Sequence, residues 1–143
     1  MREVKETTVD LLVSRPASIS FSVTEGGHAS PAKLTILNQR PTAGEIRLGP
    51  SFEIPAANVM LTATGSGQLP IAPGSYRIVA SRGPEFTIDM KDVELKPGAE
   101  AKVAFTLTRA VDVGNYACVD LHQHALPSPD SAVGLTARAI SNL

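Results

Sequence analysis

Apolar and polar positions alternate along most of the first 110 residues. Residues 19–23 read Ile-Ser-Phe-Ser-Val, residues 103–107 read Val-Ala-Phe-Thr-Leu, and the same alternation recurs in Ala32–Leu37 and Ser75–Ser81. Because successive side chains of a strand point to opposite faces, each segment predicts a strand with one buried face. We expect one shared interior for the in-phase side chains of Phe21, Leu34, Ile36, Tyr76, Ile78, Val103, Phe105 and Leu107.

Glycine and proline mark the turns between these strands. Gly26-Gly27 separates the first two strands, which we read as a hairpin with a long loop. Lys96-Pro97-Gly98 separates a strand ending at Leu95 from the strand over 103–107, a second predicted hairpin. Shorter candidate strands are Glu45–Leu48, Val59–Thr64, an edge strand at Gln68–Ile71, and Glu85–Ile88. This spacing predicts a mainly β fold, an antiparallel β-sandwich over residues 16–110, with an extension or strand over 1–15.

The period of the apolar positions changes after residue 130. One face of a helix would carry Leu135, Ala139, Ile140 and Leu143. Asp130 or Ser131 is the predicted cap of this helix. The stripe reaches the last residue without a capping residue after it, so we expect residues 111–143 to be the start of a second, incomplete domain. Such a helix needs something to pack on, and self-association through it is one outcome.

Composition indicates a globular chain and disfavours two classes of partner. Hydrophobic residues are 43% and charged residues 19%, which is enough apolar material for a core. The 13 basic and 14 acidic residues form no basic stripe, so nucleic acid is not expected. No stretch approaches the roughly 20 apolar residues of a membrane-spanning helix, and the N-terminus lacks a secretory signal pattern. We therefore expect a soluble chain, of undetermined compartment, with export of the parent protein left open.

The candidate chemistry lies in the last third of the chain, where an apolar run at Tyr116–Leu121 ends in His122-Gln123-His124. If this run is a strand, residues i and i+2 share a face, so the two imidazoles can converge on one metal ion. Asp130 follows after a loop with two prolines that can fold it back over the strand end. Asp120 can orient an imidazole without touching the ion. Spacing alone also fits two surface histidines, but sites are often built where strands end.

A family resemblance adds to this interpretation. The segment Asp120-Leu121-His122-Gln123-His124, followed by Ser128-Pro129-Asp130-Ser131, resembles the first motif of PHP (polymerase and histidinol phosphatase) domains. The run from Leu69 to Phe86 resembles the β domain that precedes the PHP barrel in carbaryl-hydrolase-like (CehA/McbA) metallohydrolases. Its Pro-Gly-Ser-Tyr core is similar to carboxypeptidase-regulatory, transthyretin-like domains, which belong to the wider immunoglobulin-like sandwiches. The resemblance covers about residue 31 to the C-terminus and is strongest from Gly67 onward.

The resemblance implies a distorted β/α barrel that binds divalent metal ions (zinc, manganese or iron) and hydrolyses phosphoesters or related bonds. His122 and His124 would be the first two metal ligands, and Asp130 occupies the position of the third, at which members of the family differ. The other ligands would come from later barrel strands, so metal binding by this chain alone should be weak or absent. The implied partners are the rest of the barrel and a small-molecule ester or phosphoester.

Two functions therefore remain open. In the first, the chain is part of a metal-dependent hydrolase and is itself inactive. In the second, it is a non-catalytic β-sandwich that acts as a binding or spacer module. Neither the third histidine, His28, nor the single cysteine, Cys118, matches a motif position, and we interpret them as an exposed histidine and a small buried hydrophobe.

Overall fold

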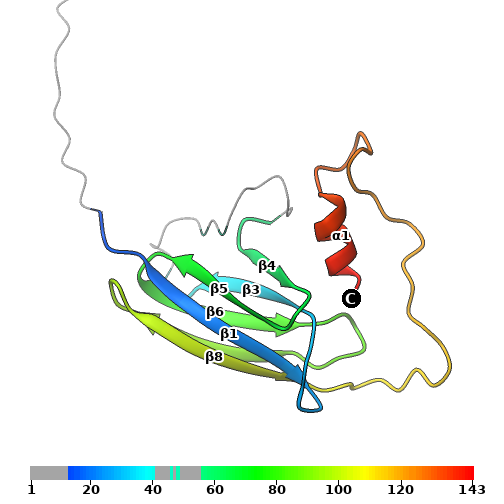
Figure 1. The fold of residues 1–143 in the computed structure, drawn as a ribbon, viewed down its shortest axis with the longest axis horizontal. Helices are drawn as coiled ribbons and strands as arrows, with labels where there is room; N and C mark the ends of the chain where they lie inside the picture. Colours follow the sequence, from blue (N-terminus) through cyan, green and yellow to red (C-terminus); the bar gives the residue numbers. More distant parts are fainter. Residues whose placement is uncertain (1–12, 41–45, 47, 49–55) are drawn as a thin grey trace, which may run out of the picture.

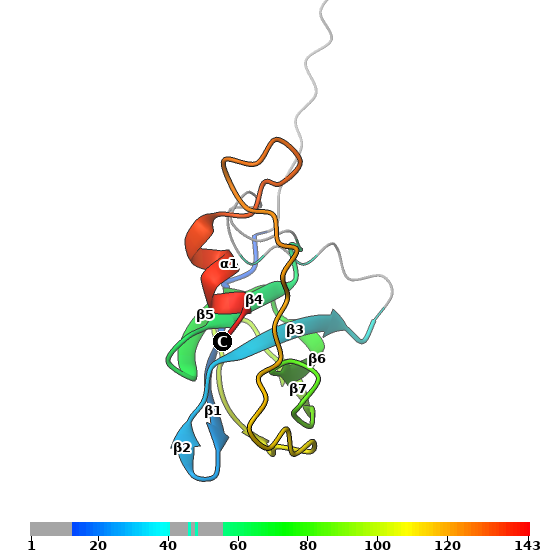
Figure 2. The same cartoon turned by 90° about the vertical axis from the view of Figure 1, so that its right-hand side faces the viewer.

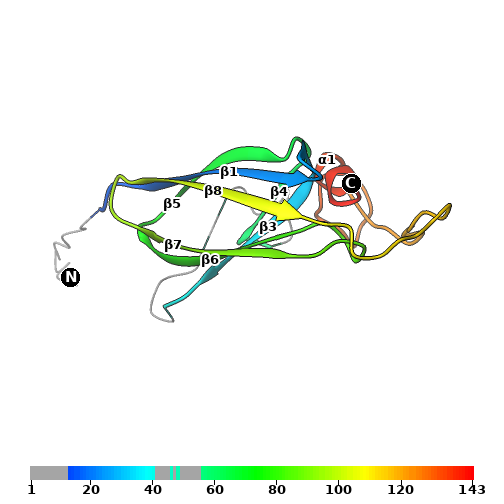
Figure 3. The same cartoon turned by 90° about the horizontal axis from the view of Figure 1, so that it is seen from below.

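The structure is a computed structural model that describes residues 13–40, 46, 48 and 56–143. Within these residues two four-stranded sheets pack against each other (Figures 1 and 3). The first sheet contains β1 (Ala17–Glu25), β2 (His28–Ala29), β5 (Ser66–Ile71) and β8 (Glu100–Leu107). The second has the order β4 (Val59–Thr62), β3 (Ala32–Asn38), β6 (Gly74–Ser81) and β7 (Asp89–Leu95). Most of the predicted strand Glu45–Leu48 and of the segment 1–15 lies outside the described residues.

β1 is the centre of the first sheet. It pairs antiparallel with β2 and β5 along one side and parallel with β8 along the other, where Phe21 lies opposite Val103. The parallel pair is a departure from the all-antiparallel arrangement expected from the sequence. Among the described residues β5 pairs with β1 alone, so the predicted edge strand is confirmed. It tolerates Pro70 because a strand edge does not require every backbone N–H to be paired.

The predicted interior is confirmed. The side chains in phase with one another on β1, β3, β6 and β8 lie in one buried cluster between the two sheets. The eight residues named from the alternation, all in that cluster, are Phe21, Leu34, Ile36, Tyr76, Ile78, Val103, Phe105 and Leu107. The Tyr76 hydroxyl donates to the Ala72 carbonyl at 2.8 Å, which satisfies its polar group at the edge of the core.

Both predicted hairpins are wrong. β1 and β3 belong to different sheets, and β1 turns back instead on the two-residue β2, with Thr24 opposite Ala29. β7 and β8 also belong to different sheets, so the turn at Lys96-Pro97-Gly98 crosses from one layer to the other. Alternation identifies the buried face of a strand. It does not identify the strand that pairs with it, because strands in two facing sheets both bury every second residue.

Residues 111–134 contain no strand, so the strand predicted for Tyr116–Leu121 is not formed. Figure 2 shows this stretch as an irregular trace that leads to α1 (Leu135–Ser141). Residues 114–123 are all exposed, which fits a segment without a neighbouring strand to pair with. The predicted helix is present, but Gly134 is its N-cap and neither Asp130 nor Ser131 caps it. No helix among the described residues is long and apolar enough to cross a membrane.

Gly65, in the connection between β4 and β5, is expected to be intolerant of substitution. Its φ is +71°, and an added Cβ would lie 2.7 to 2.8 Å from backbone atoms of Ser30 and Val23. Left-handed backbone costs an alanine roughly 1–2 kcal/mol, and the clash adds to it. We expect Gly65→Ala to lower the free energy of unfolding in chemical denaturation by at least about 2 kcal/mol. Gly26→Ala is the matched control, with a φ of +56° and nothing within 4 Å; an equal loss in both variants would contradict the clash.

Candidate metal centre

The two histidines of the sequence motif face each other. His122 Nε2 lies 2.8 Å from His124 Nε2, and the ring centroids are 4.9 Å apart with 33° between the planes. Two nitrogens that bind one tetrahedral zinc ion at 2.0–2.1 Å are about 3.3 Å apart. A small opening of the pair would therefore bring both lone pairs onto one cation. The structure brings these predicted residues together although the strand expected to carry them is absent.

Asp130 reaches the same cluster from its loop, as predicted. Its Oδ1 lies 2.9 Å from His124 Nδ1 and accepts a 2.6 Å hydrogen bond from the Ser128 hydroxyl. The Ser128 hydrogen bond, helped by the contact with His124, holds the pKa of Asp130 below its usual range. The carboxylate therefore contacts the Nδ1 side of His124, opposite the Nε2 atom that faces His122.

Asp120 lies on the other side of the motif, where its carboxylate accepts a hydrogen bond from the His122 backbone N–H at 3.0 Å. This contact fixes the turn of the main chain at residues 120–122 and does not involve the imidazole. The sequence suggested that Asp120 orients an imidazole ring. In the structure its carboxylate binds the backbone instead.

Side chains in α1 and in the residues next to it form hydrogen bonds to the histidine segment 122–124. The Arg138 guanidinium and the Ser131 hydroxyl both donate to the His124 carbonyl, at 3.0 and 3.3 Å. The side-chain amides of Gln123 and Asn142 exchange two hydrogen bonds of 3.0 and 2.7 Å. Helix and histidine segment are thus held together by polar contacts, and none of these was anticipated from sequence because they join residues 7 to 19 positions apart.

The donor set fits a cation only in part. Two imidazole nitrogens and a nearby carboxylate are ligand types used for zinc and iron. Among the described residues, however, no group of three or more His, Cys, Asp or Glu side chains has the arrangement of a metal site. A structural zinc site uses four protein ligands and a catalytic one uses three. The two imidazole nitrogens of His122 and His124 are therefore fewer donors than either kind of zinc site uses.

A charged cluster joins the start of the C-terminal segment to the sandwich. The guanidinium groups of Arg82 and Arg109 both lie over the Phe86 ring, each 4.6 Å from its centroid. Arg82 pairs with Glu25 at 2.8 Å, and Arg109 pairs with Glu85. This aromatic–cation stack fixes where the chain leaves β8, a feature that the separate positions of these residues in the sequence did not reveal.

Cys118 packs near the same cluster. It is exposed, which contradicts its interpretation as a buried hydrophobe. A hydrogen bond to the Glu85 carboxylate raises the pKa of the Cys118 thiol, because the neighbouring negative charge disfavours the thiolate.

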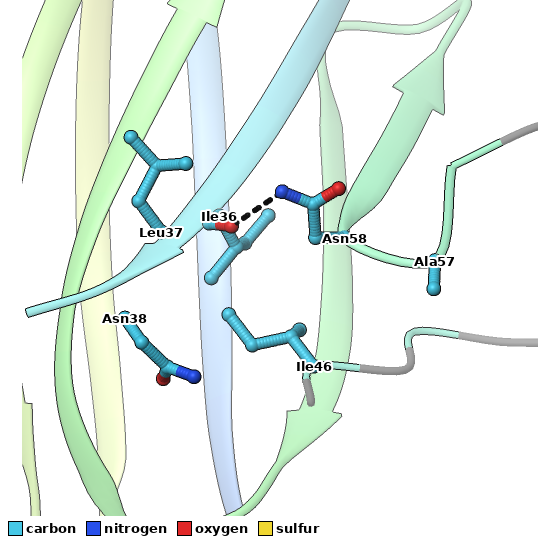
Figure 4. Close-up of a pocket in the computed structure, with 6 residues that line it drawn as sticks. All are labelled: Ile36, Leu37, Asn38, Ile46, Ala57 and Asn58. Carbon is cyan, nitrogen blue, oxygen red and sulfur yellow. Dashed lines mark hydrogen bonds between the residues drawn. The ribbon is translucent and has the colours of Figure 1, made fainter. Parts of the chain in front are cut away.

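A pocket of about 350 Å³ lies where β3 runs past β4 (Figure 4). It is lined by Ile36, Leu37, Asn38, Ile46, Ala57 and Asn58, and the Asn58 amide donates to the Ile36 carbonyl at 2.9 Å. Among the described residues, this lining contains no titratable side chain and has two side-chain amides, those of Asn38 and Asn58.

Amide exchange should divide the chain into two parts. The backbone of residues 114–123 is exposed and outside any sheet, whereas β1, β3 and β6 each have a paired strand on both sides. We expect amides of 114–123 to exchange close to unprotected rates, and those of the central strands to exchange only through global opening. Hydrogen–deuterium exchange measured by mass spectrometry tests this. Protection of 114–123 equal to that of β1 would contradict the exposed path of the segment.

No protein-family model matches the chain, and no curated protein sequence matches it. Among solved structures, the fold is similar to GBS52, a minor pilin of the gram-positive pathogen Streptococcus agalactiae, with a TM-score of 0.53 and 12% identity over 75% of this chain and 50% of that one. The phospholipase PlaB from Legionella pneumophila aligns over 92% of this chain and 33% of its own, with 15% identity and a TM-score of 0.46. The chain thus spans half or less of either protein. The likeness to the pilin supports the β-sandwich fold alone.

Proposed function

We propose that this chain contributes the first metal-binding motif of a PHP-type metal-dependent hydrolase, together with the accessory β-sandwich of that enzyme. The observation that carries the proposal is the 2.8 Å approach of His122 Nε2 to His124 Nε2, with a carboxylate beside them. The resemblance of residues 120–131 to the first PHP motif agrees with that geometry. Further ligands would come from barrel strands of the longer enzyme.

In such an enzyme a bound zinc, manganese or iron ion would activate water and polarise the bond of a small ester or phosphoester. The part of His122 and His124 is to supply two neutral nitrogen donors from one short segment. The sandwich and its stack of Arg82, Phe86 and Arg109 would hold this segment at a fixed place beside the barrel.

Calorimetric titration with Zn²⁺ tests the proposed ligands in this chain. We expect weak binding that disappears in the His122→Ala/His124→Ala variant and is unchanged in His28→Ala, the matched removal of the remaining histidine. Binding should weaken as the pH falls, because protons compete with the ion for imidazole nitrogens. Equal Zn²⁺ binding by the double variant would contradict the proposal.

A non-catalytic binding or spacer module is the second candidate. It is favoured by the donor count, since the described residues supply no third ligand arranged with the two histidines. The two candidates differ in the Zn²⁺ titration: a spacer module has no reason to bind the ion through His122 and His124.

A further inference from the structure

We infer that Asp130 is a positioning residue that fixes the tautomer and direction of the His124 ring and does not itself bind the cation. The inference rests on the proposed function and departs from the ligand role that the resemblance implies for this position. Its basis is the side of the ring that the carboxylate contacts: Asp130 Oδ1 lies 2.9 Å from Nδ1, while Nε2 faces His122.

The hydrogen bonds around Nδ1 assign its proton. The Ser128 hydroxyl gives its only hydrogen to Asp130 at 2.6 Å, so its oxygen can act only as an acceptor towards His124 Nδ1, 3.2 Å away. The ionised carboxylate is also an acceptor. Both oxygens near Nδ1 are therefore acceptors, and Nδ1 must carry the hydrogen.

A hydrogen on Nδ1 leaves the lone pair of neutral His124 on Nε2. That lone pair points at His122 Nε2, which donates its own hydrogen across the 2.8 Å gap when no ion is bound. A cation would take the place of that shared hydrogen, and His122 would move it to its other ring nitrogen. Carboxylates commonly hold metal-binding histidines in this way, which raises the basicity of the ligand nitrogen.

Further hydrogen bonds hold the backbone of His124 and the carboxylate of Asp130 in this arrangement. The His124 backbone carbonyl accepts hydrogen bonds from Arg138 and Ser131, which fix the main chain at residue 124. Ser128 in turn holds Asp130 in place. Oδ1 of Asp130 is therefore engaged with two donors before any ion arrives, and coordination through that oxygen would require both hydrogen bonds to be given up.

The tautomer can be read without metal by ¹⁵N-detected NMR of the histidine rings in the full chain. We expect His124 to be the Nδ1–H form in the wild type and in Asp130→Asn, because the amide oxygen of Asn also accepts a hydrogen bond. In Asp130→Ala the Nε2–H form should gain population, while His28 stays unchanged as an internal control. An Nε2–H form in the wild type, or no change in Asp130→Ala, would overturn the inference.

Titration with Co²⁺, followed by its visible spectrum, separates positioning from ligation. Loss of an orienting carboxylate typically weakens metal binding 10- to 100-fold, so we expect Asp130→Ala to bind Co²⁺ about 10- to 100-fold more weakly, with the wild-type spectrum at saturation and partial rescue in Asp130→Asn. A changed spectrum at saturation would make Asp130 a ligand and overturn the inference. Co²⁺ binding that is equally tight in the His122→Ala/His124→Ala variant would refute the proposed function, while the NMR result would still decide the contact between Asp130 and His124.

Discussion

Replacement of Phe105 by alanine is expected to lower the free energy of unfolding by about 3–5 kcal/mol. Phe105 is 1% exposed, is the largest fully buried side chain among the residues that the structure describes, and lies opposite Val23 where β8 pairs with β1. The cluster around it is aliphatic, with only Phe21 and Tyr76 as other aromatics. Truncation removes a ring from between the sheets and leaves a cavity that the surrounding side chains fill only in part.

Equilibrium unfolding in urea measures this loss. Lys102→Ala is the matched control, because Lys102 lies on the same strand with its side chain exposed. Surface substitutions usually change stability by less than about 0.5 kcal/mol, so the control midpoint should stay near the wild-type value. A Phe105→Ala midpoint equal to that of the control would show that the ring is not part of the interior.

The buried residues could be predicted because burial of one strand face produces a pattern among neighbouring residues of the sequence. In a half-buried strand the apolar residues must occupy alternate positions, so Ile78 and Phe105 could be assigned to the interior from their immediate neighbours. The pairing of one strand with another produces no such pattern. The parallel contact of β1 with β8 joins residues about 80 positions apart, and nothing in either strand distinguishes it from a contact across the core.

The sequence predicted which residues of the candidate site lie together, but it did not predict how they are arranged. His122, His124 and Asp130 do meet, as the motif suggested. The prediction that a strand brings the histidines to one face is wrong, since the segment lies outside both sheets. The side of the ring that Asp130 contacts depends on Ser128 and the loop path, and neither can be read from spacing.

The proposed function predicts that, in a longer protein containing this chain and a PHP-type barrel, the change His122→Ala/His124→Ala abolishes hydrolysis. The variant removes two ring nitrogens that lie 2.8 Å apart, so an ion held between them would lose two ligands. A catalytic metal supplies several kcal/mol of transition-state stabilisation, and each 1.4 kcal/mol is a factor of ten in rate. Turnover should therefore fall about 10³-fold or more.

Turnover of p-nitrophenyl acetate and p-nitrophenyl phosphate, ester and phosphoester probes, is the measurement, with bound metal determined on the same samples. His28→Ala should keep full activity and metal content, because His28 is exposed on β2, at the Gly26-Gly27 turn of the sandwich. The double variant should also keep the unfolding midpoint of the sandwich, since neither His122 nor His124 belongs to the buried cluster. Full activity in the double variant would mean that the two histidines are a surface pair. The binding or spacer module would then be the better account of this chain.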